Sequence, residues 1–188
     1  MKKISIFASG SGSNAQKIYD YFKNHPEIEI DSVVCNNKNA GILDRAIDWG
    51  CEIFLIDKKS FRETDELAKI LKERKTDLIV LAGFLWLIPM SLLKTFPDKI
   101  VNIHPALLPK FGGKGMHGAN VHQAVFEANE NESGISIHFI NEEYDKGAMI
   151  FQAKCNVFGL NPSEIAAKVL ALEHEHFPKV IHQILQNA

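Results

Sequence analysis

Residues 4–22 read Ile-Ser-Ile-Phe-Ala-Ser-Gly-Ser-Gly-Ser-Asn-Ala-Gln-Lys-Ile-Tyr-Asp-Tyr-Phe, and this stretch decides the fold. The apolar run Ile4–Ala8 predicts a short buried strand, and residues 15–22 have the apolar spacing of a helix. The glycine-rich segment 9–14 joins them. A strand, a tight turn and a helix in this order begin an α/β sheet.

The same alternation continues along the chain. Apolar runs predict further strands at 28–35, 53–56, 78–82 and 100–103. Helical patterns between them are expected at 40–49 and after residue 60, where Ser60 would cap a helix with Glu63 at capping-box spacing. A later helix is expected at 120–128, strands at 134–140 and 149–158, and a last helix from Pro162, capped by Asn161, to about Gln186. The prediction is a doubly wound, mostly parallel α/β sheet flanked by helices, with an antiparallel strand near the C-terminal part.

Composition bounds the function. The 188 residues predict one domain, 1–188, and the apolar fraction of 46% and charged fraction of 23% are those of an ordinary globular protein. A formal charge of −2 gives no basic surface for nucleic acid. Cys35, Cys51 and Cys155 are odd in number and far apart, which favours reduced thiols in the cytoplasm. No signal peptide and no apolar run long enough to span a membrane are visible.

The glycine-rich turn has the geometry of an anion site. Glycine lets the backbone come close to a ligand, and the N–H groups at a helix start face it. The turn is not a P-loop, and Ala15 occupies the last glycine position of a dinucleotide motif. The turn therefore permits a monophosphate and argues against a triphosphate or dinucleotide. The alternative is a plain tight turn between strand and helix.

Residues 102–109, Asn-Ile-His-Pro-Ala-Leu-Leu-Pro, carry the second candidate site. Asn102 and His104 are two apart on a predicted strand, so their side chains point to the same side. Pro105 ends the strand, and open α/β sheets place their sites at such carboxyl ends. An Asn amide suits an oxygen that becomes negative, and His can carry a proton near neutral pH. The alternative is a buried, hydrogen-bonded pair without a catalytic role.

Three further polar stretches could have functional roles, but each also has an ordinary structural explanation. The loop 112–118, with Lys110 and Lys114, would either close over an anionic substrate or serve as a solvated connector. His122 is expected to face solvent or to pack locally. His174 and His176 are two apart on a helix and cannot face one ion, so no metal is expected.

The octet 102–109, together with Asp145-Lys146-Gly147, resembles the signature of the formyltetrahydrofolate-dependent formyltransferases. The resemblance runs from Ile4 to about Ile181. Further matching motifs are Gly12-Ser13-Asn14, Leu81-Ala82-Gly83-Phe84, the stretch from Gly134 to Gly147, Gln152-Ala153-Lys154 and Glu173-His174. This resemblance implies that the chain has the formyltransferase fold.

The resemblance also implies a reaction, formyl transfer from the cosubstrate 10-formyltetrahydrofolate to the amine of 5-phosphoribosylglycinamide in purine synthesis. Asn102 would donate to the oxygen of a tetrahedral intermediate. His104, made cationic by Asp145, would stabilise that oxygen and protonate the leaving nitrogen. The residues implied to bind the glycinamide substrate are Gly12, Ser13, Asn14, Ala15 and Glu173.

The apolar segment Gly83–Ile88 corresponds in the family to the wall of the pterin pocket, and ordinary loop packing is the alternative reading. Trp86 stands where the family often has Arg, which is a departure from the pattern. The implied folate-binding residues are Arg62, Leu85, Trp86, Leu87, Ile88, Asn102, Asn141, Glu142, Glu143, Tyr144 and Asp145.

Other functions share parts of these motifs. Methionyl-tRNA formyltransferases carry a further C-terminal domain and a basic surface, and deformylases begin with a regulatory domain. Sugar-nucleotide formyltransferases generally lack this phosphate turn. A non-catalytic phosphate-binding module would use residues 9–14 alone and leave Asn102, His104 and Asp145 without a purpose. We expect a cytoplasmic monomer or homodimer with small-molecule substrates and no nucleic-acid or membrane partner.

Overall fold

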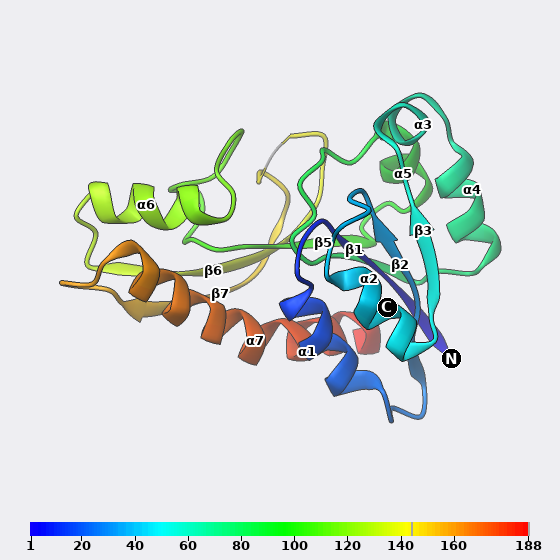
Figure 1. Ribbon diagram of the computed structural model, residues 1–188, viewed down its shortest axis with the longest axis horizontal. Coiled ribbons are helices and arrows are strands. Elements are labelled where there is room, and N and C mark those ends of the chain that lie inside the picture. Colours follow the sequence, from blue (N-terminus) through cyan, green and yellow to red (C-terminus); the bar gives the residue numbers. More distant parts are fainter. Residues whose placement is uncertain (144, 188) are drawn as a thin grey trace. The chain divides into compact units, whose positions relative to one another are not determined.

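A computed structural model describes residues 1–143 and 145–187 (Figure 1). Its elements are β1 (Lys2–Ala8), α1 (Ser13–Phe22), β2 (Ile28–Cys35), α2 (Ile42–Trp49), β3 (Glu52–Leu55), α3 (Lys58–Glu63), α4 (Glu66–Glu73), β4 (Leu78–Leu81), α5 (Met90–Thr95), β5 (Ile100–His104), α6 (Ala119–Glu127), β6 (Glu132–Phe139), β7 (Met149–Asn156) and α7 (Pro162–Asn187).

The strands form one sheet with the order β3-β2-β1-β4-β5-β6-β7. β1 pairs in parallel with β2 and with β4, and β2 pairs in parallel with β3. β6 and β7 pair antiparallel. The predicted fold class, a mostly parallel α/β sheet with an antiparallel strand near the C-terminal part, is confirmed.

The chain divides into two compact units. The first contains residues 1–101 and the end of α7 from Ile184, and the second contains residues 102–183. The division falls within β5, just before Asn102. The single domain stays a prediction.

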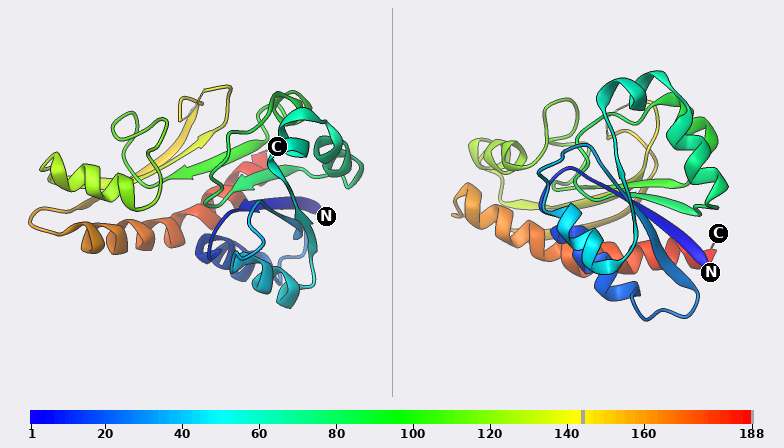
Figure 2. Two further views of the ribbon diagram at one scale, coloured as in Figure 1. Left: turned by 45° about the horizontal axis from the view of Figure 1, so that its top comes forward. Right: turned by 45° about the vertical axis from the view of Figure 1, so that its right-hand side comes forward.

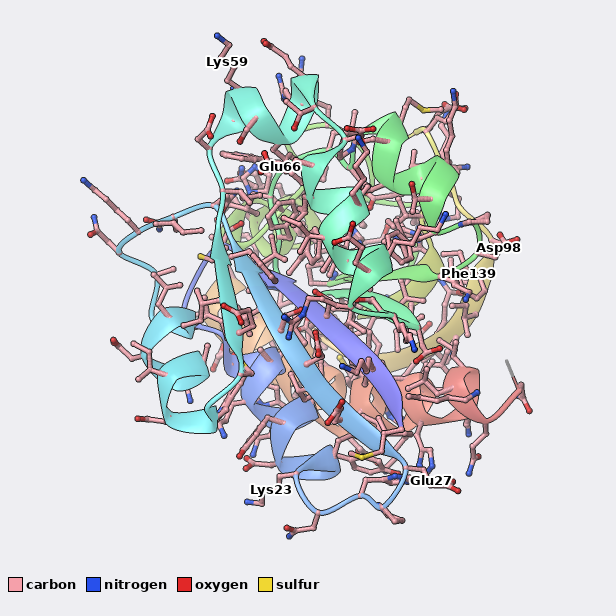
Figure 3. All side chains as sticks on the ribbon, turned by 90° about the vertical axis from the view of Figure 1, so that its right-hand side faces the viewer. Lys23, Glu27, Lys59, Glu66, Asp98 and Phe139 are labelled. Carbon is pink, nitrogen blue, oxygen red and sulfur yellow. The ribbon has the colours of Figure 1, made fainter. Side chains whose placement is uncertain are left out.

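In the first unit, α1 and α2 cover one face of the strands and α3, α4 and α5 cover the other (Figure 2). The central strands β1 and β4 are largely apolar and buried: Ile4, Ile6 and Phe7 of β1 are fully buried, and the four residues of β4 are buried as well. This double covering is the reason that β4 reads as a continuous apolar run and that β1 is apolar from Ile4 to Ala8 apart from Ser5. In Figure 3, Glu27, just before β2, and Lys59 of α3, just after β3, lie at opposite ends of the strands, so the carboxyl ends lie on the side of α3.

In the second unit, α6 and α7 lie on opposite faces of the hairpin formed by β6 and β7 (Figures 1 and 2). The hairpin closes tightly at Gly147, where a Cβ atom would lie 1.7 Å from the carbonyl oxygen of Phe139. No other residue fits there. This contact fixes the path of the loop that carries Asp145.

The structure corrects one predicted helix start, has two helices, α3 and α4, where one was predicted, and adds a further helix that was not predicted. Asp57, not Ser60, caps α3: its carboxylate accepts hydrogen bonds from the backbone N–H groups of Lys59 and Ser60. The helix begins three residues earlier than the capping-box spacing suggested, so Ser60 lies inside it. α5 follows Pro89 and was not predicted. At α7, the predicted cap is confirmed, because Asn161 Oδ1 accepts from the N–H groups of Ser163 and Glu164.

Within residues 1–143 and 145–187, none of the helices combines the length and apolar character that crossing a bilayer requires.

Candidate active site

The carboxyl end of β5 presents Asn102 and His104 within the second unit. His104 is 3% exposed, and its Nε2 lies 2.7 Å from the carbonyl oxygen of Phe111. A carbonyl can only accept, so Nε2 carries the hydrogen. The other ring nitrogen, Nδ1, lies 3.7 Å from Oδ2 of Asp145. The predicted pairing of His104 with Asp145 is therefore present in the structure.

Asp145 is held by its own contacts. Its Oδ2 accepts a 2.8 Å hydrogen bond from the N–H of Gly113, and its backbone is in the left-handed region at φ 55°. Burial acts to raise the pKa of its carboxyl, but the close approach of His138, the Gly113 N–H and His104 act more strongly. The net pKa lies below its ordinary value, so Asp145 is a carboxylate at neutral pH.

His138, on β6, is a site residue that the sequence did not single out. It is fully buried, and its Nδ1 donates to the carbonyl of Phe139 at 2.8 Å. Its Nε2 lies 3.2 Å from Nδ2 of Asn102. The same Nε2 lies 3.6 Å from Oδ1 of Asp145. The only signal in the sequence was that His138 shares a strand face with Ser136.

The protonation of His104 differs from the prediction. Burial lowers its pKa, while the Asp145 carboxylate and the Phe111 carbonyl raise it, and His138 lowers it. The carboxylate thus acts in the predicted direction, but burial acts more strongly, and the net pKa lies below the ordinary value of 6.5. His104 is neutral at neutral pH, not the cation that was expected.

The side chains of buried Ser136 and exposed Gln152 fix the segment that follows β5. Ser136 Oγ donates to the carbonyl of Ala106 at 2.7 Å and accepts from the N–H of Leu108 at 2.9 Å. Gln152 Nε2 donates to Ser136 Oγ at 2.8 Å and to the Leu108 carbonyl at 3.0 Å. The turn after His104 is therefore held by hydrogen bonds to both the N–H and the carbonyl of Leu108.

The loop that follows shows how Lys110 and His122 are placed. Lys110 pairs with Glu130 at 2.6 Å, and Lys114 is exposed. His122 packs locally in α6, where it is 8% exposed, and burial lowers its pKa. The loop's part in substrate binding stays a prediction.

The glycine-rich turn lies within the first unit. Gly12, at φ 75°, is the N-cap of α1, and a Cβ atom there would lie 2.7 Å from Cδ1 of Ile42. Ser13, Asn14 and Ala15 form the first turn of α1. Because the first N–H groups of a helix have no partner inside it, this turn can receive an anion.

The segment Gly83–Ile88 lies in an aromatic cluster of the first unit. Phe84 is buried and packs edge-on against Phe7 and Phe61, with ring centroids 5.4 and 5.6 Å apart. Trp86 is half-buried against Phe61, at 5.7 Å between centroids. Leu85 is 52% exposed. The segment thus combines core packing with apolar surface, so both predicted readings have support.

The other predicted ligand-binding residues lie as follows. Leu87 is half-buried, Ile88 is buried, and Arg62 is exposed in the last turn of α3. Asn141, Glu142 and Glu143 are exposed in the loop before Asp145, whereas Tyr144 lies outside the described residues. Glu173 is buried on α7. No group of three or more His, Cys, Asp or Glu side chains that could hold a metal occurs in the described part of the chain.

The chain belongs to the formyl transferase family, whose sequence model matches residues 2–181. It is 38% identical to the chloroplastic phosphoribosylglycinamide formyltransferase of Arabidopsis thaliana, over 98% of this chain and 66% of that protein. It is 32% identical to the phosphoribosylglycinamide formyltransferase of Bacillus subtilis, over 98% of this chain and 95% of that protein. The chain thus spans slightly less than two thirds of the Arabidopsis relative and nearly all of the Bacillus one.

A crystal structure of glycinamide ribonucleotide transformylase 1 from Geobacillus kaustophilus superimposes on this chain with a TM-score of 0.89. The two are 32% identical, and the match covers 98% of this chain and 99% of the other. The fold is therefore shared along nearly the whole chain.

Proposed function

We propose that this protein transfers the formyl group of 10-formyltetrahydrofolate to the amine of 5-phosphoribosylglycinamide. The observation that carries the proposal is the placement of His104 between the Phe111 carbonyl and the Asp145 carboxylate, on the same strand end as Asn102. The names of the relatives in Arabidopsis and Bacillus support the choice of substrate.

Each side chain has a chemical task. The substrate amine attacks the formyl carbon, so no protein nucleophile is needed. One N–H of the Asn102 amide is directed to His138, and the second is available to the formyl oxygen as it becomes negative. Neutral His104 takes the proton that the attacking amine loses and delivers it to the leaving nitrogen, and Asp145 stabilises the cation formed in between.

Ligand binding is assigned to the remaining predicted residues. Gly12, Ser13, Asn14 and Ala15 would hold the substrate phosphate, which fits the close backbone approach at Gly12. Glu173 would contact the glycinamide. For the folate, the exposed apolar side chain of Leu85 beside half-buried Trp86 fits a flat ring. The remaining folate contacts would come from Arg62, Leu87, Ile88, Asn102, Asn141, Glu142, Glu143, Tyr144 and Asp145.

The proposal extends to the setting of the reaction. The three cysteines are free thiols, which supports a cytoplasmic location. We propose small-molecule substrates, no nucleic-acid or membrane partner, and a monomer or homodimer.

One assay separates the alternatives. The purified protein is incubated with 10-formyltetrahydrofolate, with and without 5-phosphoribosylglycinamide, and formylated product and free formate are measured. We expect formylated ribonucleotide and little formate. Formate release at the same rate with and without 5-phosphoribosylglycinamide would identify a deformylase. No turnover of the folate in either arm would favour a non-catalytic phosphate-binding module.

A further inference from the structure

Three consecutive carbonyl groups in the glycine-rich turn are each bound by a donor from the segment 37–45. Asn37 Nδ2 donates to the carbonyl of Ser9 at 3.3 Å, and the backbone N–H of Ile42 donates to that of Gly10 at 3.1 Å. Arg45 Nε donates to the carbonyl of Ser11 at 2.9 Å. The carbonyl groups of residues 9, 10 and 11 are thus all held by hydrogen bonds from this one segment.

This fastening decides where the N–H groups point. In a trans peptide the C=O and N–H bonds point in opposite directions. Because the carbonyls of Ser9, Gly10 and Ser11 face the segment 37–45, the N–H groups of the following residues 10–12 face away from it. Within the described part of the chain, these three N–H groups have no acceptor. Successive N–H groups beside a left-handed residue, here Gly12, form a concave anion site.

The two side chains that take part are themselves oriented. Asn37 Oδ1 accepts from the N–H of Asn39 at 3.0 Å, so the amino group of Asn37 is the end directed at Ser9. Arg45 has a second contact: its Nη1 donates to Oε1 of Gln16 in α1 at 2.7 Å. The guanidinium therefore joins the turn to the helix that follows it. Gly41 also lies against the turn, since a Cβ atom there would be in ordinary contact with the Ser11 backbone at 3.5 Å.

We propose that Asn37 and Arg45 are positioning residues for phosphate binding: they hold the carbonyls of the turn so that its N–H groups converge on the substrate phosphate. Neither side chain needs to touch the phosphate. The inference rests on the proposed function, which assigns the phosphate to this turn. It adds that the affinity for the substrate phosphate also depends on a second segment, residues 37–45.

The test measures binding of ribose 5-phosphate by calorimetry and, in parallel, formyl-transfer kinetics. Arg45→Met keeps much of the side-chain length and removes the donors. We expect it to weaken ribose 5-phosphate binding by about tenfold, the effect of losing a hydrogen bond of ordinary strength. The Michaelis constant for the ribonucleotide should rise in proportion, while the turnover number and the Michaelis constant for the folate stay near those of the wild type.

Lys38→Met is the matched control, because Lys38 is exposed in the loop just before α2 and carries the same charge as Arg45 of that helix. It should bind ribose 5-phosphate as the wild type does. An equal loss in Lys38→Met and Arg45→Met would overturn the proposal, since general charge attraction would then explain both.

Asn37→Ala provides a second variant if Arg45→Met does not fold. It removes the donor to the Ser9 carbonyl, together with the acceptor of the Asn39 N–H, and should weaken ribose 5-phosphate binding by roughly threefold to tenfold. Binding within about twofold of the wild type in folded Asn37 and Arg45 variants would overturn the proposal. A wild-type protein that binds ribose 5-phosphate but does not transfer formyl groups would contradict the proposed function only, and the binding losses would still support the positioning role.

Discussion

Burial and charge act in opposite directions on His104. The ring is almost completely enclosed, which disfavours the cation, and the carboxylate of Asp145 lies 3.7 Å from Nδ1, which favours it. The pKa of His104 is therefore lowered, but the Asp145 carboxylate is already positioned to stabilise the ring once it is protonated. The family resemblance implied the pair. It could not show which effect is larger, because burial depends on the surrounding fold.

Asp145→Asn tests this balance. The substitution keeps the size of the side chain and an oxygen that can accept from the Gly113 N–H, but it removes the charge. We expect the turnover number to fall by roughly 100- to 10,000-fold, the range for loss of positioned acid–base catalysis. Because Asp145 raises the pKa of His104, its removal should shift the His104-dependent limb of the rate profile to lower pH.

Two controls accompany this measurement. His104→Ala should cost about as much as Asp145→Asn, and the double variant little more, because groups that act together are not additive. Substrate binding should change much less than turnover in all three. Near wild-type turnover with an unmoved pH profile in Asp145→Asn would remove Asp145 from the mechanism.

Trp86 is tested by Trp86→Ala. If it forms part of the pterin pocket, the truncation should weaken binding of folate or an antifolate by at least about tenfold and leave ribonucleotide affinity nearly unchanged. Because Trp86 also packs against Phe61, thermal unfolding must show that the variant is folded. Unchanged folate affinity in the folded variant would assign Trp86 to packing alone.

Among the elements, the turn between β1 and α1 depends on Gly12. In Gly12→Val the new side chain would meet Ile42 and require a left-handed backbone that Val disfavours. We expect the Michaelis constant for the ribonucleotide to rise by at least about tenfold, which is about 1.4 kcal/mol, with folate binding little changed. Equal weakening of both ligands would show that the turn is structural.

Most helices and strands could be predicted because apolar spacing reports burial directly. The ends and short elements could not. Asp57 and Ser60 are both good capping residues, and only the backbone path shows that the helix starts after Asp57. α5 has six residues, too few for a clear period. In the site, the side chains of Asn102, His104 and Asp145 could be picked out from the sequence. The Phe111 carbonyl and the Gly113 N–H could not, because they are backbone groups that give no sequence signal.

At the scale of the whole molecule, a carboxylate with a well-buried side chain, Asp31, lies far from the predicted active-site residues in sequence. The register of β1 and β2 shifts between Ile4 and Ser5, which leaves Asp31 as an extra residue in β2. Its side chain is 5% exposed and accepts from Lys3 at 2.9 Å and from Arg74 at 2.7 Å. Burial acts to raise the pKa of its carboxyl, but hydrogen bonds from Arg74 and Lys3 act more strongly and lower it.

Asp31 should therefore make stability depend on pH. A lowered folded-state pKa means that the carboxylate stabilises the fold above its ordinary pKa of 3.8, and that this is lost as the pH falls through the folded-state value. We expect Asp31→Asn to lower the free energy of unfolding at pH 7 by about 1–3 kcal/mol, measured in urea. The difference from the wild type should shrink below pH 4.

Glu29→Gln is the control, because Glu29 is more exposed and lies 3.6 Å from Lys3. It should change stability by less than about 0.5 kcal/mol. An effect of Asp31→Asn that stays the same from pH 7 to pH 3 would show that packing, not charge, is responsible.

The order of the strands also bears on how the protein avoids aggregation. β3 and β7 are the two edges of the sheet, and an edge strand can pair with another molecule. β3 has only four residues, and its Glu52 lies 3.7 Å from Arg74, which also covers the Phe54 ring. On β7, Lys154 pairs with Glu132 at 2.9 Å. Replacing Glu52 and Lys154 by Val should leave formyl transfer intact while light scattering detects self-association at lower protein concentration, since charge at an open edge repels further strands.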